Sequence, residues 1–197
     1  MVLISLYWFL VALALALTEI EIEGKHGWAE KTATWSKRVS LPKGFFLFSG
    51  SRVLTGYHIF LNIFLIIITH SPLVFFKTFS WSSEFQLIST YLIWALFWDL
   101  LWFIFNPYYG WKEFAPNAVW WFGEEPWLMN KLPLKYFIQI GIGLLLITIS
   151  SQLSGDKRVI LDFLILIATF IALTLLSHLF LRRIYHSYYW RTHKKTD

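Results

Sequence analysis

Cysteine is absent from this 197-residue chain, and charged residues are scarce. The lack of cysteine excludes disulfides, thiolate-bound metals and a cysteine nucleophile. Only 15% of the residues are charged, whereas 57% are hydrophobic and the mean hydropathy is +0.55. A soluble domain of this length has too little interior to bury so much apolar surface. The composition therefore predicts a polytopic membrane protein.

Several catalytic motifs are also missing. The chain has no phosphate-binding Gly-x4-Gly-Lys-Ser/Thr loop, no His-Glu-x2-His zinc motif and no Gly-x-Ser-x-Gly nucleophile turn. Paired aspartates for a magnesium-bound diphosphate are absent, and the six histidines are dispersed. A haem held by His58 and His178 is disfavoured, because His178 lies opposite the polar residues of its own span. The sequence assigns no metal site and leaves any cofactor unknown.

Five apolar runs approach the roughly 20 residues that a transmembrane helix needs. They cover residues 2–18, 53–70, 85–105, 134–150 and 159–181. The first run could instead be a cleaved signal peptide, since its alternating alanines offer cleavage sites, although no Lys or Arg precedes it. The expected fold is an all-α, polytopic integral membrane bundle of about five helices in a single membrane domain.

Two basic segments predict the orientation. Residues 24–52 carry six Lys and Arg against Glu30 alone, and the tail 182–197 carries five against Asp197. Four expected spans separate these segments, so both fit the cytoplasmic side, with the N-terminus outside. Beside membrane spans, this charge favours membrane lipids over nucleic acid as partners. The expected location is an integral membrane position, in the cytoplasmic membrane if the source is prokaryotic.

Polar residues within the spans fall on narrow helical faces at 100° per residue. Because lipid offers no hydrogen-bond partners, these faces should meet inside the bundle. They either hold helices together through interhelical hydrogen bonds or line a pocket. The faces comprise Thr55, His58, Asn62 and Thr69 in the second span, and Tyr136, Gln139, Gly143 and Ser150 in the fourth.

Asp99 is the only charged residue in the run 85–105, and it shares a helical face with Asn106. Charges inside a membrane are costly and are therefore functional candidates. Asp99 precedes Phe105 by six residues, or roughly 9 Å of helix rise, which predicts a position in the inner half of the membrane. His58 has a similar predicted depth. The two residues could form a catalytic acid/base pair, bind a metal or headgroup, or form a buried structural pair.

The acidic segment 19–26 follows the first run. If it is helical, Glu19, Glu23 and His26 share one face at the cytoplasmic mouth of the Asp99 site. Glu23 and His26 also form a Glu-x-x-His pair, the kind used by di-iron carboxylate bundles, but a second pair is absent. Two glycines disfavour a continuous helix, and the Glu/Ile alternation fits a short extended segment equally well. A solvated acidic turn is a further alternative.

The loop 106–133 is rich in aromatic residues, including Tyr108, Trp120 and Trp121, and falls on the cytoplasmic side in this topology. One interpretation is an interfacial belt that lies flat among the headgroups. The other is a lid whose rings hold an acyl chain, an isoprenoid or a cationic headgroup.

The leading functional hypothesis is a membrane-embedded pocket centred on Asp99 and His58. It would bind a lipid-like or amphiphilic small molecule, and would modify it if the protein is an enzyme, which the sequence leaves open. One alternative is a proton- or ion-coupled transporter, and another is a non-catalytic subunit or assembly factor that binds partner helices or a second copy of the chain. The expected binding residues are Asn62, Asn106, Gln139, Glu19, Glu23, His26, Tyr108, Trp120 and Trp121.

Overall fold

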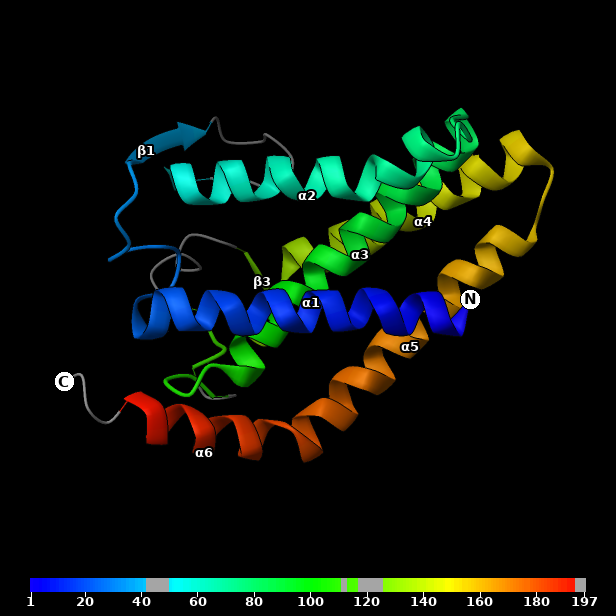
Figure 1. Cartoon of the computed structure of the whole chain (residues 1–197). Helices are drawn as coiled ribbons and strands as arrows, with labels where there is room; N and C mark the ends of the chain where they lie inside the picture. Colours follow the sequence, from blue (N-terminus) through cyan, green and yellow to red (C-terminus); the bar gives the residue numbers. More distant parts are fainter. Residues whose placement is uncertain (42–49, 111–112, 117–125, 194–197) are drawn as a thin grey trace.

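The computed structural model describes residues 1–41, 50–110, 113–116 and 126–193 (Figure 1). Within these residues, five helices are long and apolar enough to cross a membrane, which confirms the predicted helical class and is compatible with a membrane protein. The long helices are α1 (Val2–Glu23), α2 (Gly56–Phe75), α3 (Trp81–Phe105), α4 (Leu134–Ser154) and α5 (Arg158–Phe180). The other elements are the 3-10 turn η1 (Gly24–His26), α6 (Arg182–His193), β1 (Ser36–Leu41), β2 (Gly50–Thr55), β3 (Trp127–Leu128) and β4 (Leu132–Pro133).

Helix α3 forms the centre of the bundle and packs against α1, α4 and α5. Many of its large side chains are almost completely buried, as Trp94, Leu101 and Phe105 illustrate. Helix α1 presents Ala12 and Ala16 within the core, and both are fully buried. Small residues one turn apart allow two helix backbones to approach closely, which accounts for the tight contact of α1 with the bundle.

Helix α1 is longer than the predicted span 2–18, because it continues to Glu23 before ending at Gly24, whose φ is 55°. Glu19 and Glu23 extend the buried face of α1 at helical spacing and are only 6% and 7% exposed. The extended segment and the solvated acidic turn are therefore wrong for these two glutamates. The face of α1 that carries Glu19 and Glu23 points into the bundle, and both side chains are buried for this reason.

Side-chain caps set the starts of α2 and α3, and the remaining boundaries shift by a few residues. Helix α2 begins at Gly56, three residues after the predicted start, because Thr55 ends strand β2 and its side chain accepts a hydrogen bond from the His58 N–H. It continues through Pro72 to Phe75. Helix α3 begins at Trp81, before the predicted residue 85, because a capping box starts at Ser80. Helix α4 extends beyond residue 150 to Ser154, and α5 shifts by one residue at each end.

The connecting segments contain structure that an all-α fold did not predict. In the basic loop 24–52, β1 and β2 form an antiparallel hairpin with Ser36 opposite Thr55. In the aromatic loop 106–133, β3 and β4 form a second, shorter hairpin. The basic tail becomes helix α6, which packs on the bundle through buried Tyr189. Arg182 Nε of α6 donates to the Ile104 carbonyl at 2.9 Å.

Several helix ends meet at one end of the bundle. Figure 1 shows the C-terminal end of α1, the start of α2, strand β1 and α6 on the same side, with the N-terminus on the other. The side-chain amide of Asn106, just after α3, donates to the Gly24 carbonyl at 2.9 Å and so ties the ends of α3 and α1 together. The candidate site lies at this end.

Candidate functional site

A cavity of about 360 Å³ lies among α1, α2, α3 and α4, near the helix ends described above, and is partly open to the surroundings. Six of the residues predicted to form the site line it together, from four different helices. The polar and charged lining consists of Glu19, Glu23, His58, Asn62, Asp99, Lys135, Tyr136 and Gln139. The apolar lining consists of Trp28, Ala95, Leu96, Trp98 and Trp102.

Asp99 faces the first turn of α4. Its Oδ2 atom accepts a hydrogen bond of 2.6 Å from the Tyr136 hydroxyl and lies 3.3 Å from Lys135 Nζ. Tyr136 is buried, whereas Asp99 keeps about a third of its side chain exposed. An ammonium and a phenol therefore compensate the carboxylate without excluding it from the cavity.

His58 lies in the first turn of α2, and its ring is held on two sides. Nδ1 lies 2.6 Å from Thr55 Oγ1, and the indole of Trp28 stacks on the imidazole with ring centroids 4.3 Å apart. Nε2 lies 3.6 Å from Oε1 of Glu23. His58 and Asp99 line the same cavity, but the carboxylate paired with His58 is that of Glu23.

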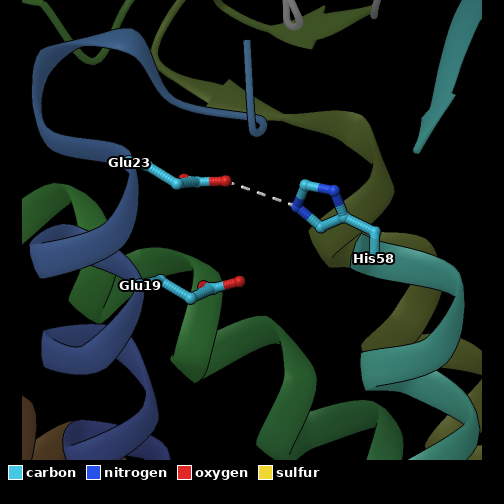
Figure 2. A group of neighbouring side chains, drawn as sticks. All are labelled: Glu19, Glu23 and His58. Carbon is cyan, nitrogen blue, oxygen red and sulfur yellow. Dashed lines mark ion pairs between the residues drawn. The ribbon is translucent and has the colours of Figure 1, made fainter. Parts of the chain in front are cut away.

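The two glutamates of α1 reach the cavity from one side. Figure 2 shows Glu19 and Glu23 extending from successive turns of α1 toward His58 on α2. The Ala29 N–H donates to Glu23 Oε1 at 2.6 Å. This contact depends on a turn in which Trp28 and Ala29 both adopt left-handed φ values of 51° and 53°. Non-glycine residues rarely adopt this conformation, so the turn holds Trp28 and Ala29 against the site at some cost in backbone strain.

Two amides complete the polar lining. Asn62 donates from Nδ2 to the His58 carbonyl at 2.7 Å and accepts from the Tyr91 hydroxyl at 3.1 Å. Its hydrogen bonds therefore stabilise α2 locally and tie it to α3. Gln139 differs, because its buried Oε1 atom has no hydrogen-bond partner among the described residues. Such an acceptor is available to a ligand that brings an N–H or O–H group.

The remaining predicted site residues lie elsewhere. Asn106 is fully buried, but it is bonded to Gly24 and to the Tyr108 N–H and does not belong to the cavity lining. His26 pairs with Glu30 at 3.5 Å, and Tyr108 packs against Trp190 of α6. Trp120 and Trp121, on which the lid interpretation depends, fall outside the described residues, and the lid stays a prediction. The described part of that loop contributes Phe114, whose ring stacks near Tyr136 with centroids 6.4 Å apart.

Sequence reasoning missed three important residues of this cavity. Lys135 lies four residues before Gln139 and therefore shares its helical face. This spacing could have indicated its role, but a lysine at a helix end is usually an interfacial anchor. Tyr136 was on the predicted polar face without being assigned to Asp99. Trp28 lies in a loop, where no periodicity indicates which way a side chain points.

The cavity holds two groups of reactive side chains. Asp99, Lys135 and Tyr136 form one. In the other, Glu19, Glu23 and His58 each offer a ligand atom, and these atoms lie within 4.8 Å of one another, close enough to consider a shared metal ion. Among the described residues, Lys135 is the only Lys or Arg in the lining, against three carboxylates. The lining is therefore rich in negative charge when its acids are ionised.

Comparisons with protein-family models, with curated proteins and with solved structures found no match to this chain. The five apolar helices suggest a membrane location. Function must therefore be inferred from the residues of the cavity themselves.

Proposed function

We propose that the cavity binds the polar head of an amphiphilic small molecule whose apolar part extends along the helices. The observation that carries this proposal is the placement of charged side chains and indole rings in one partly open cavity near the ends of four apolar helices. Ligand pockets generally combine mostly apolar walls with a few polar groups that fix orientation. This cavity has that composition.

The polar groups favour a head that donates hydrogen bonds. The lining carries more carboxylates than cations, and the buried Gln139 Oε1 lacks a partner among the described residues. A hydroxyl, amine or amide of the ligand would satisfy this acceptor, whereas leaving it unpaired costs about 1–3 kcal/mol. Lys135 and Tyr136 remain beside Asp99 to contact an acceptor on the same head.

The apolar walls favour a ligand drawn from the bilayer. Trp28, Trp98 and Trp102 present large aromatic surfaces next to the charged groups. At about 360 Å³ the cavity is near the small end of the roughly 300–1,000 Å³ range of ligand pockets, so it would hold a head and the first part of a chain. The remaining chain would stay among lipids.

A cavity-filling variant tests the proposal. Ala95 lines the cavity, so Ala95→Phe would fill the space without removing a polar contact. The wild type and this variant are purified in mild detergent, washed and extracted, and the retained amphiphiles are measured by mass spectrometry. We expect the wild type to retain a defined compound that Ala95→Phe retains at least about tenfold less, since one overlapping ring costs more than 1.4 kcal/mol.

Ala14→Phe is the matched control, because Ala14 is an exposed residue of α1 outside the cavity lining. It should retain the compound as the wild type does. Equal retention by the wild type and Ala95→Phe, with both proteins monodisperse, would overturn the proposal.

Asp99→Asn separates amphiphile binding from the other two classes. A proton-coupled transporter reconstituted in vesicles should lose pH-dependent flux, and an assembly subunit should lose its partner on co-purification. Amphiphile binding predicts altered retention of the compound without either effect.

A further inference from the structure

Glu19, Glu23 and His58 form a cluster whose chemistry does not depend on the identity of the amphiphile. We propose that these three side chains bind one divalent transition-metal ion, with Zn²⁺ as the representative case. Their ligand atoms lie within 4.8 Å of one another, and one pair, Glu23 Oε1 and His58 Nε2, is 3.6 Å apart. Ligands bound tetrahedrally to zinc at about 2.1 Å are roughly 3.4 Å apart, so Glu23 and His58 are already close to that spacing. Glu19 would complete the set by a shift on the order of 1 Å, within the reach of side-chain rotation.

The charge of the cavity calls for a cation beside Glu19. This carboxylate is 6% exposed and points into the cavity toward His58 (Figure 2). Among the described residues, no Lys, Arg or His forms an ion pair with it, and its polar neighbours are the neutral Trp98 and Tyr57. A buried ionised carboxylate without a countercharge is strongly disfavoured. The group must therefore be neutralised by a proton or by a cation.

A divalent cation would also offset the surrounding negative charges. Asp99 interacts electrostatically with both Glu19 and Glu23, which adds a third negative charge to the same region. Lys135, the one Lys or Arg that the described part of the chain contributes to the lining, lies against Asp99. With Glu19, Glu23 and Asp99 ionised, Lys135 cationic and His58 neutral, these five groups sum to a net charge of −2, which one divalent ion would balance.

The orientation of His58 fits a metal ligand. Its Nδ1 atom is held by the Thr55 hydroxyl, and this leaves Nε2 directed at Glu23 (Figure 2). Histidines that bind metals almost always hydrogen-bond through their other ring nitrogen, which fixes the tautomer and the ring plane. The stacked indole of Trp28 restricts the same ring further.

The donor types select the class of metal. One imidazole and two carboxylates suit Zn²⁺, Mn²⁺, Fe²⁺ or Co²⁺ better than Ca²⁺ or Mg²⁺, which prefer oxygen ligands alone. Three protein ligands also leave a coordination position that faces the cavity. Such an open position is typical of sites where a metal contacts water or a bound molecule.

Direct metal binding tests this proposal. The full chain is purified in detergent with an affinity tag that lacks histidine, stripped with a chelator and titrated with Zn²⁺ alone. Bound zinc is measured by equilibrium dialysis with elemental analysis, and the thermal midpoint is followed in parallel. We expect about one equivalent of tightly bound zinc and a higher thermal midpoint in its presence, because the ion binds only the folded site.

Variants then assign the ligands. Glu19→Gln, Glu23→Gln and His58→Gln should each weaken zinc binding by at least about 100-fold, since loss of a direct ligand should exceed the 10–100-fold loss seen for outer hydrogen-bond partners. Gln keeps the oxygen that accepts from Ala29 at position 23, so folding should persist. Glu21→Gln and His70→Asn are controls. Glu21 pairs instead with α6, and His70 belongs to a separate His–Glu pair with Glu84.

Stoichiometric binding that is lost in the three ligand variants and kept in both controls supports the site. Absence of stoichiometric zinc binding by the folded wild type would overturn it, whatever the variants do. Equal binding by the wild type and Glu19→Gln would overturn it as well. The amphiphile retained by the wild type is measured separately, so failure of one proposal is distinguishable from failure of the other.

Discussion

At the scale of single residues, Asp99 shows how the fold accommodates a charge within an apolar helix. Lys135 and Tyr136, in the first turn of α4, both contact its Oδ2 atom. The side chain remains 31% exposed, so solvent screens the ion pair and its contribution to stability is on the order of 1 kcal/mol. Asp99 is therefore held in place while still available to the cavity.

This arrangement predicts coupling between the two charges. Asp99→Asn keeps an oxygen for the Tyr136 hydroxyl but removes the charge opposite Lys135, and should cost about 1 kcal/mol of unfolding free energy. Lys135→Met should cost a similar amount. The double variant should lose less than the sum, because both changes remove the same interaction. Equilibrium unfolding in detergent measures all three, and strictly additive losses would contradict the pairing.

Thr55 supports both a helix and a ring. Its hydroxyl caps α2 and contacts His58 Nδ1. Thr55→Val, which has nearly the same shape, should lower the unfolding free energy by about 1 kcal/mol through loss of the cap. It should also weaken zinc binding roughly 10–100-fold through loss of the outer hydrogen bond. Thr55→Ser keeps the hydroxyl and should retain most of both properties in the same titration, so an equal loss in Ser and Val would contradict this role.

At the scale of elements, helical periodicity predicts which face of a helix is polar but says little about which helix it meets. The face carrying His58 does line the cavity, yet Glu23 reaches the imidazole because α1 continues five residues beyond its predicted end at residue 18. The hydropathy signal falls where the glutamates begin, although the helix does not. Tertiary burial, which hydropathy along the chain cannot report, decided that boundary.

Two glycines of α4 give a matched test of helix packing. A Cβ at Gly143 would lie 2.9 Å from Cζ of Phe163 on α5, whereas a Cβ at Gly141 would meet nothing within 4 Å. Gly143→Ala should therefore destabilise the α4–α5 contact by about 1 kcal/mol or more through overpacking. Gly141→Ala should stabilise the chain by roughly 0.5–1 kcal/mol through helix propensity. Thermal unfolding of both variants measures the contrast, and shifts of the same sign would contradict it.

At the scale of the whole molecule, composition and apolar runs were sufficient to predict the helical class and all five long helices. The cavity was only partly predictable. Asp99, His58 and the two glutamates stood out because charged or polar groups are unusual near apolar spans. Lys135 and Trp28 did not, because a lysine at a helix end and a tryptophan in a loop are ordinary at a membrane boundary. The hairpin β1–β2 depends on pairing between two segments that are separated along the chain. The basic composition of residues 24–52 gives no indication of this pairing.

The orientation in the membrane remains a prediction, and the absence of native cysteine makes it easy to test. By the positive-inside rule, the end of the bundle that carries the cavity faces the cytoplasm. A single cysteine from Glu30→Cys should then react with a membrane-impermeant maleimide only when the cytoplasmic face is accessible. One from Asp156→Cys, in the exposed α4–α5 turn, should react only from the opposite face. The reverse labelling pattern would contradict the predicted orientation.

Of the 20 residues of helix α2, only Gly56, Leu65 and Thr69 are buried by the described part of the chain, so most of its surface is at least partly exposed there. His58 therefore lies on α2, the helix of the cavity that is easiest to displace. The two glutamates lie on α1, which packs within the core. Any ion or molecule that bridges α1 and α2 must also hold α2 in position, and the free energy that this requires lowers its binding affinity. Two ligands that never touch each other could thus assist one another, simply because the first has already immobilised the movable wall.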